Sequence, residues 1–261
     1  MISSKNIVLT GADSGIGYEV LKLLAADKSN RILAVDINED RMHLFCDNVI
    51  PFRCDVSSKE AVDSIFEKAE ELFGKIDIFY ANAGYPYYEV FDYVDWDRTK
   101  RMFETNVFSP IYTYQKYREH LNGREGHYAM TVSAIGKMAM PGFATYSASK
   151  FALEGWQQGI RFENPKNIKL TCLYPIATDT GFFKAANEVE FEKPFPVQSP
   201  RVVAKKMVVA LEKGKKSCNP SGLFTLSGIL FSVCPPIKST YLALEKNKFK
   251  RFAKKIGKTI D

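Results

Sequence analysis

A phenol and an ammonium group stand four residues apart in the segment Tyr146-Ser147-Ala148-Ser149-Lys150. If this segment is helical, the first and last side chains lie on one face of the helix. A tyrosine with its ordinary pKa of about 10 is a poor base at neutral pH, but a cation about 4 to 6 Å away stabilises the phenolate and lowers that pKa. The pair therefore suits proton exchange with an alcohol or carbonyl oxygen.

The same spacing occurs in two other tyrosine–lysine pairs, so spacing alone selects no site. These pairs are Tyr18 with Lys22 and Tyr112 with Lys116. Only Tyr146 lies shortly after a predicted strand that ends in a hydroxyl residue, Ser133. Open α/β sheets bind ligands at the carboxyl ends of their strands, where Ser133 could donate a hydrogen bond to a substrate oxygen. This context favours Tyr146, and the other two pairs are predicted to lie on helix surfaces.

Short apolar runs alternate with segments of helical period along most of the chain. The predicted strands are 6–10, 31–36, 49–53, 76–81, 127–132 and 168–173, and the first helices are 16–28, 39–46 and 58–73. A final helix is predicted from Pro200, with Ser199 as its N-cap, to a stop at Gly214. This alternation indicates an α/β fold with a doubly wound parallel sheet and helices on both faces. No linker interrupts it, so no domain boundary is expected before about residue 237.

The first predicted strand runs directly into a glycine-rich turn, Thr10-Gly11-Ala12-Asp13-Ser14-Gly15-Ile16-Gly17. A helical pattern follows the turn. In such an arrangement the backbone N–H groups and the helix N-terminus face a pyrophosphate, and glycines stand where a Cβ would block its approach. The position at the first strand–helix junction favours a dinucleotide site over a merely tight turn.

Asp36 ends the second predicted strand, 19 residues after Gly17. An acidic side chain there can accept hydrogen bonds from a ribose 2′-hydroxyl and would repel a 2′-phosphate. No basic residue directly follows Asp36, although Arg41 is near in the sequence. NAD is therefore predicted in preference to NADP, and the alternative is a solvated aspartate at a strand end.

Five motifs, in this order, resemble the short-chain dehydrogenase/reductase family over about residues 5–215. They are the glycine turn, Cys54-Asp55-Val56 after the third strand, Asn82-Ala83-Gly84 after the fourth, Asn106 in a long helix, and Ser133 with Tyr146 and Lys150. The resemblance implies a single-domain Rossmann fold with a seven-stranded parallel sheet. It also implies reversible hydride transfer between NAD(H) and a secondary alcohol or ketone.

The resemblance assigns a role to each motif residue. Tyr146 is implied as the acid/base, Lys150 as the group that holds the nicotinamide ribose, Ser133 as the group that orients the substrate oxygen, and Asn106 as the holder of a water in a proton relay. The implied cofactor contacts are Gly11, Asp13, Ser14, Gly15, Ile16, Gly17, Asp36, Asp55, Val56, Asn82, Ala83, Gly84, Tyr146, Lys150, Pro175, Thr178 and Thr180. Ile176 departs from the family pattern, where a glycine is usual. No metal site is expected.

Two aromatic stretches, residues 85–93 and 182–195, should flank the reacting carbon. In the family these positions form the rim and the mobile lid of the substrate site, and the lid is expected at about 181–199. An apolar, fairly bulky or lipid-like alcohol or ketone is therefore predicted. The alternative is that many of these rings fill core or interface space.

The net charge of +6 is confined to the C-terminal tail. Residues 238–261 hold eight basic and two acidic side chains, while the first 237 residues are balanced. A protein that binds nucleic acid would be expected to carry a basic face on its body as well, so no nucleic-acid partner is predicted. The apolar run 222–237 is too short and too broken by Gly and Pro to span a membrane.

The tail has a basic amphipathic pattern. Its apolar side chains at 242, 249, 252, 253 and 256 share roughly one helical face, and lysines occupy the others. This pattern predicts weak peripheral contact with anionic membranes. The alternatives are a helix that caps the substrate pocket and a subunit contact.

Several other properties follow from the sequence or the resemblance. The five cysteines are widely spaced without a C-x-x-C pair, which predicts reduced thiols, and no secretory signal is recognisable, which favours the cytoplasm. The resemblance implies a homodimer or homotetramer that uses the helices around 96–121 and 146–163.

Two other functions compete with that of a dehydrogenase. A catalytically silent cofactor-binding regulator or scaffold is disfavoured because all four catalytic residues are present. A serine hydrolase is disfavoured because only three histidines are available and no G-x-S-x-G elbow occurs.

Overall fold

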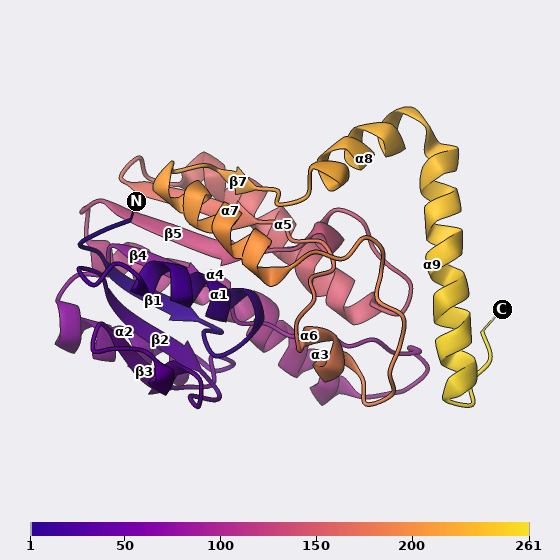
Figure 1. The fold of residues 1–261 in the computed structure, drawn as a ribbon, viewed down its shortest axis with the longest axis horizontal. Coiled ribbons are helices and arrows are strands. Elements are labelled where there is room, and N and C mark those ends of the chain that lie inside the picture. The colour runs from indigo at the N-terminus through magenta and orange to yellow at the C-terminus, as the bar shows by residue number, and fades with distance from the viewer. Residues whose placement is uncertain (1, 261) are drawn as a thin grey trace.

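Seven parallel strands form one sheet in the computed structural model, which describes residues 2–260 (Figure 1). Across the described residues the strand order is β3-β2-β1-β4-β5-β6-β7. The strands are β1 (Asn6–Thr10), β2 (Arg31–Asp36), β3 (Val49–Arg53), β4 (Ile78–Ala81), β5 (Gly126–Thr131), β6 (Ile168–Leu173) and β7 (Ser217–Cys218). The predicted doubly wound α/β fold with a seven-stranded sheet is confirmed.

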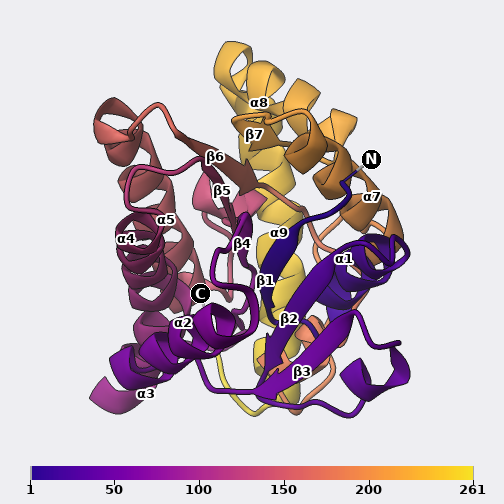
Figure 2. The same cartoon turned by 90° about the vertical axis from the view of Figure 1, so that its left-hand side faces the viewer.

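Helices cover both faces of the sheet, as Figure 2 shows end on. One face packs against α1 (Gly15–Ala25) and α7 (Pro200–Glu212), and the other against α2 (Lys59–Phe73), α4 (Ser109–Leu121) and α5 (Ala144–Glu163). Because the strands are buried on both sides, they read as continuous apolar runs rather than alternating ones. The strand order reverses beside β1, where β2 and β4 lie on opposite sides of it. Ligands bind at such a reversal, outside the carboxyl ends of the strands.

The predicted helix at 39–46 is wrong, since only a 3-10 turn, Met42–Leu44, forms there. The carboxylate of Asp13 accepts hydrogen bonds from the backbone N–H groups of Arg41 and Met42, at 2.8 and 3.0 Å. These bonds tie the segment to the glycine turn.

The long helix expected around 96–121 is interrupted. It consists of α3 (Trp96–Phe103), a π-helical turn (Glu104–Phe108) and α4. Pro110 has no N–H to donate to the carbonyl of Asn106, so the regular hydrogen-bond ladder breaks there. Such π-helical turns are frequent at functional sites.

The chain ends in two helices, α8 (Gly222–Val233) and α9 (Pro235–Lys255). Figure 1 shows α9 standing beside the loops that carry α3 and the short α6 (Phe182–Ala186). Phe252 is 2% exposed and belongs to an aromatic cluster with Tyr88 and Phe143. The C-terminal part of α9 therefore packs on the body. No helix within residues 2–260 combines the length and apolar character needed to cross a bilayer.

Candidate active site

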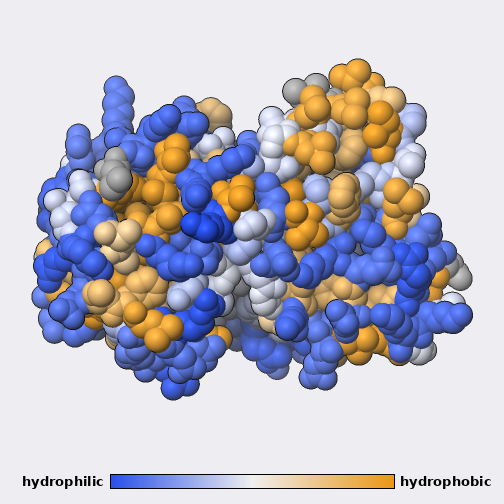
Figure 3. Space-filling model, viewed as in Figure 1, coloured by the Kyte–Doolittle hydropathy of each residue, from blue (hydrophilic) through white to orange (hydrophobic). Residues whose placement is uncertain are grey.

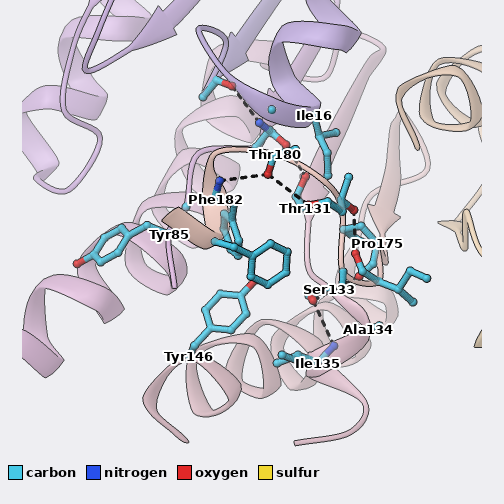
Figure 4. A pocket seen from close by; sticks show the side chains of 18 of the residues that line it. Ile16, Tyr85, Thr131, Ser133, Ala134, Ile135, Tyr146, Pro175, Thr180 and Phe182 are labelled. Atoms are coloured by element: carbon cyan, nitrogen blue, oxygen red, sulfur yellow. Dashed lines mark hydrogen bonds between the residues drawn. The ribbon is translucent and has the colours of Figure 1, made fainter. Parts of the chain in front are cut away.

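One cavity of about 860 Å³ runs from the glycine turn, past the carboxyl ends of the strands, to α8 and α9. Figure 4 shows its centre, where Tyr146, Ser133 and Phe182 converge from different elements. The structure brings most of the predicted site residues to its wall. These are Gly11, Ser14, Gly15, Ile16, Asp36, Asp55, Val56, Asn82, Ala83, Gly84, Ser133, Tyr146, Pro175, Thr178 and Thr180.

Lys150 is not among the residues that line this cavity, and neither are two residues of the glycine turn, Asp13 and Gly17. The carboxylate of Asp13 is engaged by the backbone of the segment after β2. A Cβ on Gly17 would lie 1.9 Å from the carbonyl oxygen of Gly11, so only glycine lets α1 start this close to the turn. Both residues shape the turn from behind its binding surface.

The glycine turn is locked to the segment that follows β4. The side-chain N–H of Asn82 donates to the carbonyl of Gly11 at 3.2 Å. The Thr10 hydroxyl accepts from the backbone N–H groups of Asn82 and Ala83, at 3.0 and 3.1 Å. These bonds hold the turn with the N-terminus of α1 facing the cavity, which is an arrangement that binds a pyrophosphate.

The Asp36 carboxylate lies at the end of β2 and lines the cavity. It accepts hydrogen bonds from the backbone N–H groups of Asp13, at 2.9 Å, and Asn38, at 3.2 Å. Burial raises the pKa of Asp36, and the same hydrogen bonds act in the opposite direction. Arg41 stacks on the ring of Tyr18 nearby, with its guanidinium 3.6 Å from the ring centroid.

Tyr146 and Lys150 both lie on α5, as the spacing predicted, and both are buried. The ammonium of Lys150 is 5.7 Å from the centroid of the Tyr146 ring. Burial lowers the pKa of Lys150 to about 7. Burial also raises the pKa of Tyr146 above its ordinary value, against a hydrogen bond with Ser133 that lowers it. The expected lowering of the Tyr146 pKa is therefore not found, because burial of the phenol outweighs the hydrogen bond with Ser133.

Lys150 is 4% exposed, and its ammonium makes one hydrogen bond within the described chain, to the carbonyl oxygen of Thr131 at 3.1 Å. An ammonium has three N–H donors. Two donors are therefore left to a ligand beside Gly84, where a Cβ would lie 3.6 Å from the nitrogen. Ribose hydroxyls could accept these hydrogen bonds, and a nicotinamide ribose is the group that the family resemblance implies for Lys150.

Ser133 adopts a backbone conformation that non-glycine residues rarely take, with φ 144°. Its Oγ accepts a hydrogen bond from the backbone N–H of Ile135 at 3.2 Å and lies 3.5 Å from the carbonyl of Pro175. Strained backbone of this kind clusters at ligand-binding sites. The strain keeps the Ser133 hydroxyl beside that of Tyr146 (Figure 4).

Asn106 lies behind the cavity wall, in the π-helical turn. Its amide donates to the carbonyl of Tyr85 at 2.9 Å and to the Ser149 hydroxyl at 3.2 Å, and its Oδ1 accepts from the backbone N–H of Tyr85 at 3.1 Å. Asn106 thus joins α5 to the segment that leaves β4.

Thr178 and Thr180 line the cavity on the segment after β6. The Thr178 hydroxyl donates to the carbonyl of Ile176 at 2.8 Å, so it is already engaged within its own loop. The side chain of Thr180 faces Gly15, where a Cβ would meet it at 3.4 Å. The segment therefore closes over the glycine turn.

The far end of the cavity was only partly predicted. The aromatic stretches 85–93 and 182–195 contribute as expected, but α8 and α9 add Phe224, Phe231 and Tyr241. Arg101 also lines the cavity, and no sequence motif singled it out. The long uncharged run at 222–237 was the available signal for the α8 wall.

Comparison with known proteins gives a consistent family assignment. A model of the short chain dehydrogenase family matches residues 5–190. The uncharacterized oxidoreductase YxnA of Bacillus subtilis is 31% identical over 226 residues, which cover 80% of this chain and 63% of that protein. The 3-dehydrosphinganine reductase of Danio rerio is 27% identical over 260 residues, covering 90% of this chain and 76% of that protein. The chain thus spans less than two thirds of the length of the Bacillus relative.

Solved structures share the fold. A short chain dehydrogenase from Burkholderia cenocepacia in complex with NADP superposes with a TM-score of 0.77 at 21% identity, covering 92% of this chain and 99% of that one. The 3-ketoacyl-(acyl-carrier-protein) reductase from Brucella melitensis complexed with NADH superposes with a TM-score of 0.74 at 21% identity, covering 84% of this chain and 97% of that one. Because the family model matches most of its length and the fold is shared, the chain belongs to the short chain dehydrogenase family of oxidoreductases.

Proposed function

We propose that the protein transfers a hydride between NAD(H) and an apolar secondary alcohol or ketone, with Tyr146 as the acid/base. The observation that carries this proposal is the position of the Tyr146 and Ser133 hydroxyls. They lie in one cavity that joins the glycine turn to an apolar, aromatic end. A carbonyl held between them would face the nicotinamide end of the cavity.

Each side chain of the site has a chemical task in this proposal. Ser133 and Tyr146 hydrogen-bond the substrate oxygen, and Tyr146 gives its proton to that oxygen during reduction. The nicotinamide supplies or accepts the hydride. Burial raises the pKa of Tyr146, yet proton transfer remains favourable because an alkoxide is far more basic than a phenolate. Lys150 holds the ribose hydroxyls, and Asn106 supports a water that passes protons between Lys150 and solvent.

The proposed cofactor is NAD, with NADP disfavoured, because the Asp36 carboxylate lines the cavity at the end of β2. A carboxylate accepts hydrogen bonds from a ribose 2′-hydroxyl and repels a 2′-phosphate. Asp55 and Val56 would border the adenine, and Asn82 the adenosine ribose.

The proposed substrate is apolar or lipid-like. Phe143, Phe182 and Phe183 line the substrate end of the cavity, and the rings of Tyr88 and Phe191 pack in the core cluster behind them, with centroids 3.9 Å apart. The name of the zebrafish relative, 3-dehydrosphinganine reductase, supports a reductase. Residues 181–199 are proposed as the lid, since Phe182 and Phe195 line the cavity from that segment.

Assembly and location remain predictions. We propose a homodimer or homotetramer built on α3, α4 and α5, where Trp96 of α3, Phe162 of α5 and Phe108 of the π-helical turn are exposed. We also propose a catalytic domain at 1–237 followed by a tail at 238–261, and a cytoplasmic location.

A panel of ketones of increasing chain length, assayed for NADH oxidation, tests the proposed function. The expected result is that kcat/KM rises about three- to fourfold per methylene until the apolar end is filled. NADH binding without turnover on any ketone or alcohol would instead support the silent scaffold.

A further inference from the structure

The helix α8 carries an apolar surface that the body leaves uncovered. No charged residue occurs between positions 217 and 237 of the sequence. Leu226, Leu230 and Val233 are 62%, 42% and 78% exposed, and their spacing places them on one face of α8. Figure 3 shows the apolar surface gathered over this helix. Contiguous exposed patches of this kind mark sites of contact with a membrane or a partner.

A different face of α8 forms part of the wall of the proposed substrate cavity. Phe224, Ser227 and Phe231 line that cavity, and Phe231 stacks on Tyr241 of α9 with ring centroids 6.0 Å apart. Among the described elements, α8 packs chiefly on α9. This single helix therefore stands between the apolar end of the cavity and the outside of the molecule.

Basic residues flank the uncharged run in the sequence. Lys215 and Lys216 precede the uncharged run, and Lys238 follows it. Lys238 and Lys137 also line a second cavity of about 420 Å³, whose wall includes Phe224 and Phe231. An apolar helix bordered by lysines complements a bilayer surface with anionic headgroups.

The exposed apolar surface needed for contact with a membrane is found on α8 and not on the amphipathic tail. The apolar face of α9 is used inside the molecule: Phe252 is buried, and Leu242, Phe249 and Ile256 pack against the same aromatic cluster. The exposed apolar surface thus lies on α8, a position different from the one predicted for 238–261.

We propose that α8 docks on an anionic membrane, with Leu226, Leu230 and Val233 inserted at the interface and Lys215, Lys216 and Lys238 at the headgroups. The docked helix places the apolar end of the cavity against the bilayer, so that a lipid-like substrate enters from the membrane. Substrate entry rests on the proposed function, whereas the docking itself does not.

Co-sedimentation of the full chain with vesicles tests the docking. Vesicles of phosphatidylcholine alone are compared with vesicles that also contain phosphatidylserine. The expected result is binding to the anionic vesicles that weakens with salt and falls at least about tenfold in the double variant Leu226→Glu/Leu230→Glu. A matched control, Leu44→Glu/Val94→Glu, makes the same charge change at two exposed apolar residues far from α8 in sequence and keeps binding within about twofold.

Equal vesicle binding by the α8 variant and wild type would overturn the proposal, as would an absence of binding by wild type. Sedimentation velocity tests the alternative that a second copy of the chain, rather than a membrane, covers this surface. If the α8 substitutions convert an oligomer to a monomer and the wild-type protein does not bind vesicles, the surface is a subunit contact. Circular dichroism and NADH binding report whether the variants fold.

Failure of the docking and failure of the proposed function give different results. Turnover of a short, water-soluble ketone without vesicle binding contradicts only the docking. Vesicle binding that is lost in the α8 variant, without turnover of any ketone, supports the docking and contradicts the proposed chemistry.

Discussion

The cofactor end and the substrate end of the cavity are built from different interactions. At the cofactor end, directional hydrogen bonds tie Thr10, Asn82 and Asp36 to backbone groups of neighbouring strands and turns. At the substrate end, segments far apart in sequence meet through ring contacts, such as those of Tyr88 with Phe191 and Phe252.

This difference explains why one end can be recognised from short motifs and the other cannot. Hydrogen bonds to backbone groups fix residue type and spacing, because a donor or acceptor without a partner is costly when buried. Apolar contacts are non-directional, so many combinations of large side chains can fill the same space. The cofactor end should therefore be intolerant of small changes, and the substrate end should respond mainly to lost volume.

The largest effect is expected for Gly17→Ala at the cofactor end. The added Cβ would lie 1.9 Å from the Gly11 carbonyl oxygen, so the turn or α1 must shift. We expect a loss of about 3 kcal/mol or more in the free energy of unfolding, together with loss of NADH binding. Urea denaturation measures it. Gly159→Ala, in a helix with open space around it, should leave stability unchanged or raise it by up to about 1 kcal/mol.

A large effect confined to the substrate end is expected for Phe252→Ala. The buried ring joins α9 to the aromatic cluster, and its removal leaves a void or releases the helix. The KM for an apolar ketone should rise about tenfold while the Kd of NADH changes less than about twofold. Initial rates and NADH titration measure the two constants. Leu244→Ala, at an exposed position on the same helix, is the control. An equal loss of NADH affinity in Phe252→Ala would contradict the independence of the two ends of the cavity.

Cofactor choice should respond to Asp36→Asn. Loss of the carboxylate charge removes a charge-assisted hydrogen bond to the ribose and the repulsion of a 2′-phosphate, so kcat/KM for NAD should fall about tenfold or more while that for NADP does not fall. Steady-state rates with both cofactors measure the ratio. Asp40→Asn, at an exposed position in the same loop, should leave it unchanged. An unaltered ratio in Asp36→Asn would contradict the assignment to NAD.

A pH-dependent effect on stability is expected at Lys150, where the two ends meet. Burial lowers its pKa from 10.5 to about 7, so the folded state carries the full cost of a buried cation below about pH 7. Between those two pKa values the unfolded chain binds a proton that the folded chain does not, and stability therefore rises with pH. The stability gained in cofactor-free Lys150→Met should be greatest below about pH 7 and shrink as pH rises towards 10. Urea denaturation across this range measures it, and a gain independent of pH would refute the shift.

The sequence predicted the sheet and the cofactor end well, because both depend on local patterns. The predicted strands agree with β1, β2, β3 and β6 at both ends, and with β4 and β5 to within two residues. The glycine turn, Asp36 and Asn82 lie together as expected. The 39–46 segment was not predicted, because its shape depends on a tertiary contact from Asp13. The interruption at Asn106 was also not predicted, although its cause, Pro110, is visible in the sequence.

The substrate end was harder to predict, because its wall depends on how distant segments pack. The apolar spacing of the tail was recognised, but not that Phe252 turns into the aromatic cluster or that Leu226 stays exposed on α8. The direction of the Tyr146 pKa was also mispredicted. Spacing shows that an ammonium is near, but it does not show that burial of the phenol raises its pKa.

The central claim is that the Tyr146 phenol exchanges the proton during hydride transfer. The most direct test is a single turnover of enzyme preloaded with NADH and mixed with a ketone, in Tyr146→Phe and in Tyr112→Phe. Tyr112 belongs to an equally spaced pair on α4, and its hydroxyl donates to Asp63 at 2.8 Å. We expect NADH oxidation to be slowed about 10²- to 10⁴-fold in Tyr146→Phe only, with NADH affinity retained in both variants. Oxidation at the wild-type rate in Tyr146→Phe would contradict it.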